Sequence, residues 1–275
     1  MKLVVKEVIK ATPDSVILKF NKPTESFKYN AGQYLTLIVP IDGEEVRRAY
    51  SLCSSPTEDE FPAIGIKRVK DGKVSNFVND NTKVGDEFEV LEPMGNFKCE
   101  VEPNGQRSIV LMGGGSGMTP LISIAKTILA QETASMVSLI NVNLNKDFSL
   151  FAKDIDALKS AYGTRFRVID HFVEEEVMTK KGLFKKALAP KGLPKAKHLK
   201  GYLKDFNIEN TDENLCYICG PVGLMDSSTE ALKRIGIDSS RIFRESFVVD
   251  LSTANADATT FEGTSTVPVK IMGEE

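Results

Sequence analysis

The sequence is poor in the residues that most metal sites and disulfide scaffolds need. It has no tryptophan, two histidines and four cysteines in 275 residues, which leaves little scope for histidine-based metal or acid–base chemistry. Four cysteines are also too few for a fold of this length to be stabilised mainly by disulfides. No apolar run approaches the ~18–20 residues that span a bilayer, and the charged N-terminus is unlike a signal peptide. We therefore expect a cytoplasmic protein with no metal site and no membrane contact.

Positive charge is not in surplus either. Lys and Arg number 35 against 38 Asp and Glu, a net charge of −3, which argues against a dedicated nucleic-acid binder. Hydrophobic residues make up 41% of the chain and charged residues 27%, so it is neither fibrous nor mostly disordered. Its length predicts one large domain or two ordinary ones.

The first part of the chain, residues 1–104, has the pattern of short strands. Glycine, proline, asparagine and aspartate interrupt its apolar segments about every ten residues, as in an antiparallel Greek-key barrel or sandwich. The strands expected here include 3–5, 15–20, 34–39 and 63–67, and one helix is expected to begin near Ser75.

The pattern changes in residues 107–248. Short apolar strands alternate there with segments of helical period, which predicts a parallel sheet with helical crossovers. The expected strands are 108–112, 136–140, 166–169, 215–218 and 242–243, and the expected helices are 120–131 and 150–162. The predicted architecture is therefore a β domain followed by an α/β domain.

Two stretches stand apart from these domains. Residues 180–204 hold nine lysines and no acidic residue, which predicts a solvated insertion; a docking patch for an acidic partner is the alternative. Residues 249–260 are rich in small polar residues and predict a linker. Two further strands are expected at 260–263 and 266–271. Because a lone hairpin is marginal in water, the chain is expected to stop just inside a third domain, 261–275.

The run Gly113-Gly114-Gly115-Ser116-Gly117-Met118-Thr119-Pro120 joins an expected strand to an expected helix. Glycines at such a junction let backbone N–H groups approach a pyrophosphate at the positive end of the helix, and a proline suits the first helical turn. The spacing departs from the ordinary dinucleotide fingerprint, and a flexible loop is the alternative. The strand–turn–helix context favours phosphate binding.

Two motifs of the first domain could bind a second phosphate group. In the Arg47–Ser51 strand, the Arg48 guanidinium can bind a phosphate in bidentate fashion. Tyr50 lies on the same face of the strand, and Ser51 points to the other face. In the Gly72–Ser75 segment, Ser75 is expected to cap a helix whose preceding loop offers free N–H groups. Taken alone, each motif also has an ordinary structural explanation.

Cys216 and Cys219 form a C-x-x-C pair, a pattern found in metal sites and redox disulfides. They fall on or just past an expected buried strand, where alternate side chains point to opposite faces, and no second pair exists. We therefore expect a single thiol, Cys219, at the carboxyl end of a strand, where α/β folds bind ligands.

Taken in order, these motifs resemble the ferredoxin–NADP reductase superfamily, together with Cys219-Gly220-Pro221 and Glu245-Ser246-Phe247. The resemblance covers residues 1–248. The linker and the Phe261-Glu262-Gly263 segment resemble members with a C-terminal plant-type [2Fe–2S] ferredoxin domain, the reductase components of bacterial oxygenases of the phenylacetyl-CoA epoxygenase or ketosteroid hydroxylase type. The cluster cysteines of that domain are absent here, so the chain is expected to be truncated.

The resemblance implies that the first domain binds FAD. Arg48 would hold the flavin pyrophosphate, Tyr50 would pack on the isoalloxazine, and Ser51 would hydrogen-bond near flavin N5. Further FAD contacts are implied for Ala49, Ile66, Lys67, Gly72, Lys73, Val74 and Ser75, with Ile66 and Lys67 acting through their backbone.

The resemblance also implies that the second domain binds NADH or NADPH. The pyrophosphate and nicotinamide would face Gly114, Gly115, Gly117, Met118, Thr119 and Pro120. Cys219, Gly220 and Pro221 would lie beside the nicotinamide, Glu245 near the flavin ring edge, and Phe247 over the flavin face. Ser51, Cys219 and Glu245 are the residues expected to act in hydride transfer.

The choice between the two nucleotides stays open. Relatives often carry arginines that can meet a 2′-phosphate, but the matching positions here are Asn143-Leu144 and Gly201-Tyr202. Lys146, Lys200 or Lys204 could substitute as point charges. The activity expected is hydride transfer from NAD(P)H to FAD, followed by single-electron transfer to a ferredoxin domain in cis and an oxygenase component. The alternatives are a free flavin reductase, an FMN-containing relative, or a non-catalytic redox-sensing regulatory protein.

Overall fold

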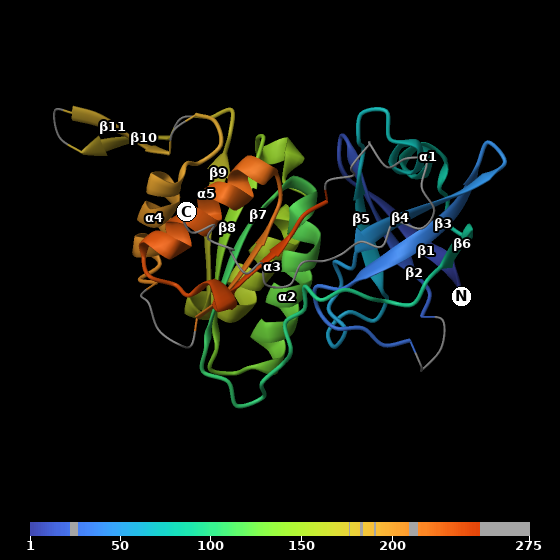
Figure 1. Cartoon of the computed structure of the whole chain (residues 1–275), viewed down its shortest axis with the longest axis horizontal. Coiled ribbons are helices and arrows are strands. Elements are labelled where there is room, and N and C mark those ends of the chain that lie inside the picture. Colours follow the sequence, from blue (N-terminus) through green and yellow to red (C-terminus); the bar gives the residue numbers. More distant parts are fainter. Residues whose placement is uncertain (23–26, 176, 182–183, 190, 209–213, 248–275) are drawn as a thin grey trace, which may run out of the picture.

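The computed structural model describes residues 1–22, 27–175, 177–181, 184–189, 191–208 and 214–247. They form an all-β domain and an α/β domain that lie side by side (Figure 1). The linker at 249–260 and the strands expected after it lie outside the described residues. Within the described part of the chain, no helix is both long and apolar enough to cross a membrane.

Six antiparallel strands form the first domain, in the order β4-β3-β6-β1-β2-β5. A bridge between Leu52, just after β4, and Ile64 of β5 brings the two ends of that order together. Side chains such as Leu3, Leu18 and Leu35 fill the interior and are fully buried. The elements are β1 (Lys2–Thr12), β2 (Ser15–Phe20), β3 (Tyr34–Ile41), β4 (Glu44–Ser51), β5 (Ala63–Lys67), α1 (Lys73–Asn81) and β6 (Glu87–Val90).

Five parallel strands form the sheet of the second domain, in the order β13-β12-β7-β8-β9. They are β7 (Ser108–Gly114), β8 (Met136–Asn143), β9 (Phe166–Phe172), β12 (Asn214–Cys219) and β13 (Ile242–Glu245). Both faces are covered, so successive residues of β7, such as Val110 and Leu111, enter different cores.

Helices α2 and α3 cover the sheet face toward the first domain, and α4 and α5 cover the other face (Figure 1). Their bounds are α2 (Met118–Gln131), α3 (Ala152–Tyr162), α4 (Ala196–Asp205) and α5 (Val222–Arg234). A hairpin of β10 (Val177–Lys181) and β11 (Phe184–Ala189) follows β9. Short 3-10 turns are η1 (Gly115–Gly117), η2 (Lys146–Phe148), η3 (Gly163–Arg165) and η4 (Ser239–Arg241).

The predicted fold class, an antiparallel β domain before a parallel α/β domain, is confirmed. The interpretation of residues 180–204 as a solvated insertion is wrong for their second half. That half forms α4, and its Leu199 and Leu203 side chains are fully buried against the sheet. Between its apolar positions the helix presents lysines, and these dominate its composition.

Helix α2 packs on the first domain as well as on its own sheet. Its residues Leu121 and Ile124 share one core cluster with Cys53 and Phe97 of the first part of the chain. A seam of short hydroxyl groups adds polar contacts: Ser123 Oγ donates to the Ser54 carbonyl at 2.6 Å, and Ser55 Oγ lies 2.8 Å from Thr127 Oγ1. The two domains are therefore held at a fixed distance by one helix.

A buried ion pair anchors the segment that connects the domains. Arg107, just before β7, contacts the Glu132 carboxylate at 2.6 Å, and the Glu132 side chain is 0% exposed. The Glu132 carboxylate also accepts hydrogen bonds from the Glu102 backbone N–H and from Ser135 Oγ. Burial raises the pKa of Glu132, but the bonds from Arg107, Glu102 and Ser135 outweigh it and hold that pKa below its usual range.

We expect Glu132→Gln to lower the free energy of unfolding at pH 7 by about 3 kcal/mol, because it removes the buried carboxylate partner of the Arg107 guanidinium and leaves only the exposed carboxylate of Glu102. Acid should act in the same direction, since a lowered pKa stabilises only above its unfolded value and is lost as the pH falls. Urea unfolding measures both the loss of stability caused by the substitution and the loss caused by acid. Glu102→Gln is the control: its side chain is 62% exposed and contacts the same guanidinium at 2.8 Å, so the loss should stay below about 1 kcal/mol. Equal losses of stability in Glu132→Gln and Glu102→Gln would contradict the role given to burial.

Candidate functional site

The two domains meet where strands β4, β12 and β13 end. Ser51, the last residue of β4, donates a hydrogen bond from Oγ to Glu245 Oε2 at 3.4 Å, and this bond crosses the domain junction. Glu245 is the last residue of β13 and lies opposite Cys219, the last residue of β12. The structure thus brings together Ser51, Cys219 and Glu245, which lie far apart in the sequence.

Burial controls the charge of this group. The Glu245 side chain is 8% exposed, and burial raises its pKa to about 8, opposed by the Ser51 hydrogen bond. The Cys219 thiol is fully buried, and burial, with the Glu245 charge, raises its pKa well above the usual value. At neutral pH the group is therefore a carboxylic acid, a thiol and a hydroxyl, all uncharged.

Cys216 and Cys219 are both free thiols on opposite faces of the sheet. Cys216 belongs to the core under α4 and α5, whereas Cys219 belongs to the core under α2. Their separation follows from the alternation of β12, and it prevents them from forming a disulfide with each other. No group of three or more potential metal ligands gathers among the residues that the structure describes.

Arg48 and Tyr50 lie on β4 and are both half-buried. The Arg48 guanidinium donates to the Arg47 carbonyl at 2.7 Å and makes no ion pair with a described residue, so it is available to an anion. Burial raises the pKa of the Tyr50 hydroxyl above its usual range, and the Arg48 charge opposes this. Ala49 lies between them on the strand, where only its backbone and one methyl group can contact a ligand.

The prediction that Ser75 caps helix α1 is wrong. The helix begins at Lys73 with Gly72 as its N-cap residue, and no side chain caps it. Ser75 Oγ instead accepts the Val69 N–H at 3.1 Å and donates to the Gly72 carbonyl, so it shapes the loop before the helix. Val74 is a core residue, which leaves only its backbone for a ligand. Because no side chain caps the start of α1, its first backbone N–H groups and the positive end of its dipole can bind an anion.

The glycine-rich loop joins β7 to α2 through the turn η1. A Cβ added to Gly117 would lie 2.3 Å from the Cys219 carbonyl, and one added to Gly114 would lie 2.4 Å from the Val142 carbonyl. Gly115 has a φ of +56°, a region that favours glycine. These glycines let the loop press against the ends of β8 and β12, which places the uncapped start of α2 beside Cys219 and Gly220.

The side chain of Met118 belongs to the core between α2 and the first domain, and Thr119 and Pro120 are also buried. Thr119 Oγ1 donates to the Ser116 carbonyl at 2.8 Å. No acidic residue lies in the first turn of α2, so nothing there opposes a phosphate.

The side chain of Lys67 is a feature that sequence reasoning missed. Lys67 follows the fully buried Ile66 on β5, and its ammonium lies 3.3 Å from Asp14 Oδ2. That ammonium is also the sole group within 4 Å of a Cβ added to Gly115. A cation from the first domain thus stands over the glycine loop of the second. No local sequence pattern indicates this, because the approach depends on how the domains pack.

Asn143, the last residue of β8, has an orphaned acceptor. The side chain is 3% exposed, and its Nδ2 donates to Asn141 Oδ1 at 2.9 Å, but its Oδ1 has no partner. Such an atom is costly unless a ligand donates to it. Tyr202, by contrast, is committed to His171 through a 3.0 Å contact between its hydroxyl and Nδ1.

Lys200 and Lys204, which were suggested for a role beside a nucleotide, lie on α4. This helix runs from the carboxyl ends of the strands back to the start of β12. Lys204, in the last turn, is therefore at the sheet edge opposite the glycine loop. Lys146 in η2 follows β8 and stays at the loop edge.

Gly220 and Pro221 continue from Cys219 into α5, and Pro221 is the N-cap residue of that helix. Gly220 has a φ of +153°, and a Cβ there would lie 3.1 Å from the Gly114 backbone nitrogen. Phe247, at the end of the described chain, is 36% exposed. An exposed aromatic two residues after Glu245 can pack against a planar ligand.

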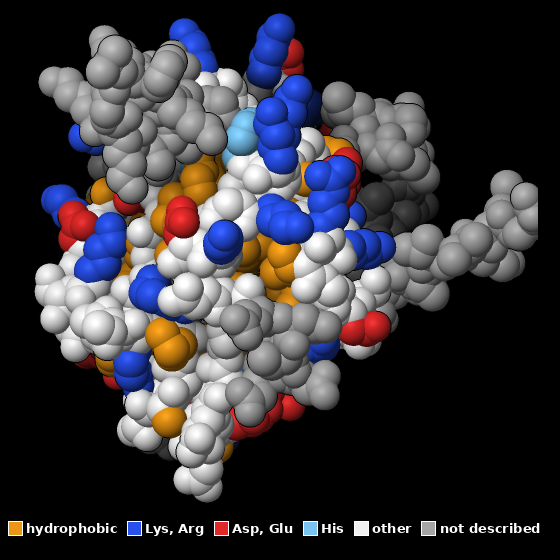
Figure 2. Space-filling model, turned by 90° about the vertical axis from the view of Figure 1, so that its left-hand side faces the viewer, with side chains coloured by type: hydrophobic (Ala, Val, Ile, Leu, Met, Phe, Trp, Pro, Cys, Tyr) orange, Lys and Arg blue, Asp and Glu red, His pale blue; other side chains and the backbone are white. Residues whose placement is uncertain are grey.

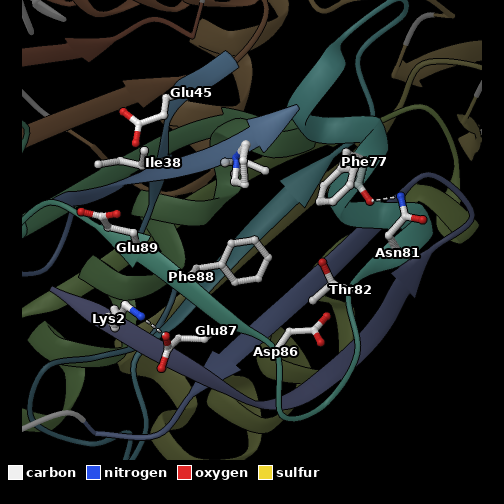
Figure 3. A pocket seen from close by; sticks show the side chains of 12 residues that line it. Lys2, Ile38, Glu45, Phe77, Asn81, Thr82, Asp86, Glu87, Phe88 and Glu89 are labelled. Atoms are coloured by element: carbon white, nitrogen blue, oxygen red, sulfur yellow. Dashed lines mark hydrogen bonds and ion pairs between the residues drawn. The ribbon is translucent and has the colours of Figure 1, made fainter. Parts of the chain in front are cut away.

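A separate hollow of about 450 Å³ lies between α1, β3 and β6, on the side of the first domain away from the second (Figure 3). Four acidic side chains, Glu45, Asp86, Glu87 and Glu89, line it, and Lys2 pairs with Glu87 at 2.5 Å. An excess of carboxylates repels phosphate. This hollow therefore does not suit a ligand that carries phosphate groups.

Residues 1–99 match the oxidoreductase FAD-binding domain, and residues 111–230 match the oxidoreductase NAD-binding domain. The ferredoxin reductase component of 3-ketosteroid-9-alpha-monooxygenase from Rhodococcus rhodochrous is 34% identical over 249 residues, 89% of this chain and 64% of that protein. One of the subunits of 1,2-phenylacetyl-CoA epoxidase from Escherichia coli is 30% identical over 248 residues, 89% of this chain and 67% of that protein.

The fold has the same kind of relatives. The FAD/NAD-binding domain of nitric oxide dioxygenase from Vibrio cholerae superposes with a TM-score of 0.73 at 23% identity, covering 90% of this chain and 98% of that one. This chain spans about two thirds of the length of the two curated relatives.

The raised pKa of Glu245 predicts how stability depends on pH. A carboxyl with a folded pKa of about 8 stays protonated in the folded protein while the unfolded chain ionises above its ordinary value. Stability should therefore fall with rising pH, by about 1.4 kcal/mol per unit between pH 5 and 7.5. Glu245→Gln should remove this slope in flavin-free protein. Urea unfolding at several pH values measures it, and parallel pH profiles for the two proteins would refute the assignment.

Proposed function

Because the chain belongs to the FAD- and NAD-binding oxidoreductases of the ferredoxin reductase type, we propose that it transfers hydride from NADH or NADPH to FAD and passes single electrons to an oxygenase system. The observation that carries the proposal is the meeting of Ser51, Cys219 and Glu245 at the end of the glycine loop. That arrangement brings residues of both domains to one place.

FAD would lie along β4 and the start of α1. Arg48 would form charge-assisted hydrogen bonds to its pyrophosphate, and Tyr50, two residues on, would pack against the ring system. The backbone from Gly72 to Ser75 would supply further N–H groups to the phosphates. The observations that support this are the free Arg48 guanidinium and the uncapped start of α1.

NAD(P)H would lie across the glycine loop, with its pyrophosphate at the start of α2. The space over Gly115 and the Lys67 ammonium beyond it fit a phosphate better than a side chain. Asn143 Oδ1 would accept a hydrogen bond from the nucleotide, which would satisfy its orphaned acceptor. The nicotinamide end would then reach Cys219 and Gly220.

The chain's own residues would act mainly by positioning. FAD, when bound, accepts hydride as an electron pair and releases electrons singly, which supplies the redox chemistry. Ser51, Cys219 and Glu245 are buried, and burial raises the pKa of Cys219 and Glu245, so the three residues would border the two rings without adding a competing charge. With two histidines in the whole chain, acid–base catalysis has little place.

The onward carrier would be a [2Fe–2S] ferredoxin domain in cis, and the final acceptor an oxygenase component. The support for this is the kind of protein that the relatives are, a monooxygenase reductase component and a part of an epoxidase. A one-electron carrier is the natural partner of a flavin that has taken up a pair of electrons.

Replacing Arg48 by Ala should make the protein lose flavin about 10–100-fold more readily, because a charge-assisted phosphate contact is worth ~1.5–3 kcal/mol. Flavin absorbance after dialysis measures the loss. Arg47→Ala is the matched control: its side chain is exposed on the other face of β4, so flavin content should not change. Stoichiometric flavin in both variants would exclude Arg48 from the site.

Stopped-flow mixing with NADH or NADPH tests the reaction itself. The flavin absorbance band should bleach. In Cys219→Ala, with full flavin content, bleaching should be slower by roughly tenfold or more, because the nicotinamide loses a positioning contact. Cys216→Ala removes a thiol of equal burial on the opposite face of the sheet and should react at the wild-type rate. A chain that binds FAD but is never reduced by either nucleotide would overturn the proposed function.

A further inference from the structure

A row of lysines covers the outer side of helix α4. We call Lys191, Lys195, Lys197, Lys200 and Lys204 the lysine face; all five side chains are exposed. None of them forms an ion pair with any residue that the structure describes. The nearest acidic side chains on α5 are already paired: Asp226 contacts Arg244 at 2.7 Å and Glu230 contacts Arg234 at 2.6 Å.

Two lysines of the face do not serve the stability of their own helix. Lys195 is the N-cap residue of α4 and Lys197 lies in its first turn, where the positive end of the helix dipole disfavours cations. No acidic residue occupies that turn. A helix selected for stability alone would carry the opposite charge here.

The charge of this face also affects its histidine. Burial lowers the pKa of His198, and the positive charges of Lys197, His171 and Lys195 lower it further. The Lys195 backbone N–H donates to His198 Nδ1 at 3.2 Å, which requires that nitrogen to be unprotonated. Both observations indicate a positive potential at the start of α4.

The lysine face belongs to the side of the second domain that is turned away from the first. Helix α4 lies on the side of the sheet away from the first domain (Figure 1). Figure 2 looks onto this side and shows more Lys and Arg than Asp and Glu side chains on the surface. Four further lysines lie on the adjoining hairpin, where Lys180 and Lys185 are directly opposite each other in the strand register.

We propose that the lysine face docks a protein partner whose surface is rich in aspartate and glutamate. The lysines of the face have no ion-pair partner among the described residues, and two of them stand at the positive end of α4, so carboxylates of a partner would interact favourably with them. The proposal goes beyond hydride transfer: such a partner would be held on the α/β domain while the flavin side of the molecule stays open.

The composition of the face favours protein over phosphate-rich surfaces. Residues 180–204 contain no arginine, the side chain best suited to bidentate phosphate binding. The apolar side of α4 is fully committed to the core, and Leu193 is the single strongly exposed apolar side chain among described residues 191–205. That is too little apolar surface for insertion into a bilayer.

A labelled poly-glutamate peptide is the probe for this surface, with binding followed by fluorescence anisotropy at increasing salt. The full chain should bind it at low ionic strength and release it as salt screens the charges. Reversing three lysines of the face should weaken binding about tenfold or more. The matched control reverses three exposed lysines elsewhere and should change the affinity less than about twofold. The two variants are Lys197→Glu/Lys200→Glu/Lys204→Glu and Lys10→Glu/Lys83→Glu/Lys153→Glu.

Lys195→Asp separates binding from folding. An aspartate at the N-cap should raise the melting temperature by about 2–4 °C, because it accepts an N–H bond and suits the helix dipole. The same change should weaken peptide binding. A more stable protein that binds less cannot be explained by misfolding. Unchanged binding, or weaker binding with a lower melting temperature, would overturn the proposal.

Carbodiimide coupling of the peptide, followed by mass spectrometry, locates the contact. Cross-links should concentrate on lysines 191–204. Cross-links spread evenly over the molecule, or equal weakening in both triple variants, would mean that only net charge matters and would refute the assignment. Stronger binding to vesicles of phosphatidylcholine and phosphatidylglycerol than to the peptide would replace the protein partner by a membrane surface.

Discussion

Helix α2 packs on its own sheet and on the barrel at the same time, and both nucleotide sites take their positions from that double packing. Its apolar residues enter a core that includes Cys53 and Phe97 of the other domain, and its first turn carries the glycine loop. Moving the helix would move the loop away from Ser51. The buried Arg107–Glu132 pair fixes the other end of the same helix. A single element therefore sets the distance between two binding surfaces from different folds.

The sequence predicted the parts of the fold whose signals are local. Apolar runs ending in glycine located β7 and its loop, and the alternation of β12 placed Cys216 and Cys219 on opposite faces. Helix α4 was missed although Leu199 and Leu203 keep its helical period, because residues 180–204 as a whole hold nine lysines and no acidic residue. Ser75 was misplaced as a cap because Gly72, in extended conformation, starts the helix without a side chain.

The contacts between the domains could not be predicted in this way. The bond from Ser51 to Glu245 spans 194 positions of the sequence, and the approach of Lys67 to Gly115 joins two folds. Neither has a spacing that a motif can encode. The raised pKa of Glu245 likewise depends on burial by neighbours from both domains. Residues of this kind were named by resemblance, and the structure supplies the physical setting in which each would act.

The seam between α2 and the barrel consists of hydroxyl groups on the shortest polar side chains, joined at 2.6–2.8 Å and sealed from water. Short side chains have few rotamers, so this interface allows little movement between the domains and does not favour a hinge motion. The two domains should consequently move together as one rigid body. Binding and release of the pyridine nucleotide would then proceed without a swing of one domain against the other.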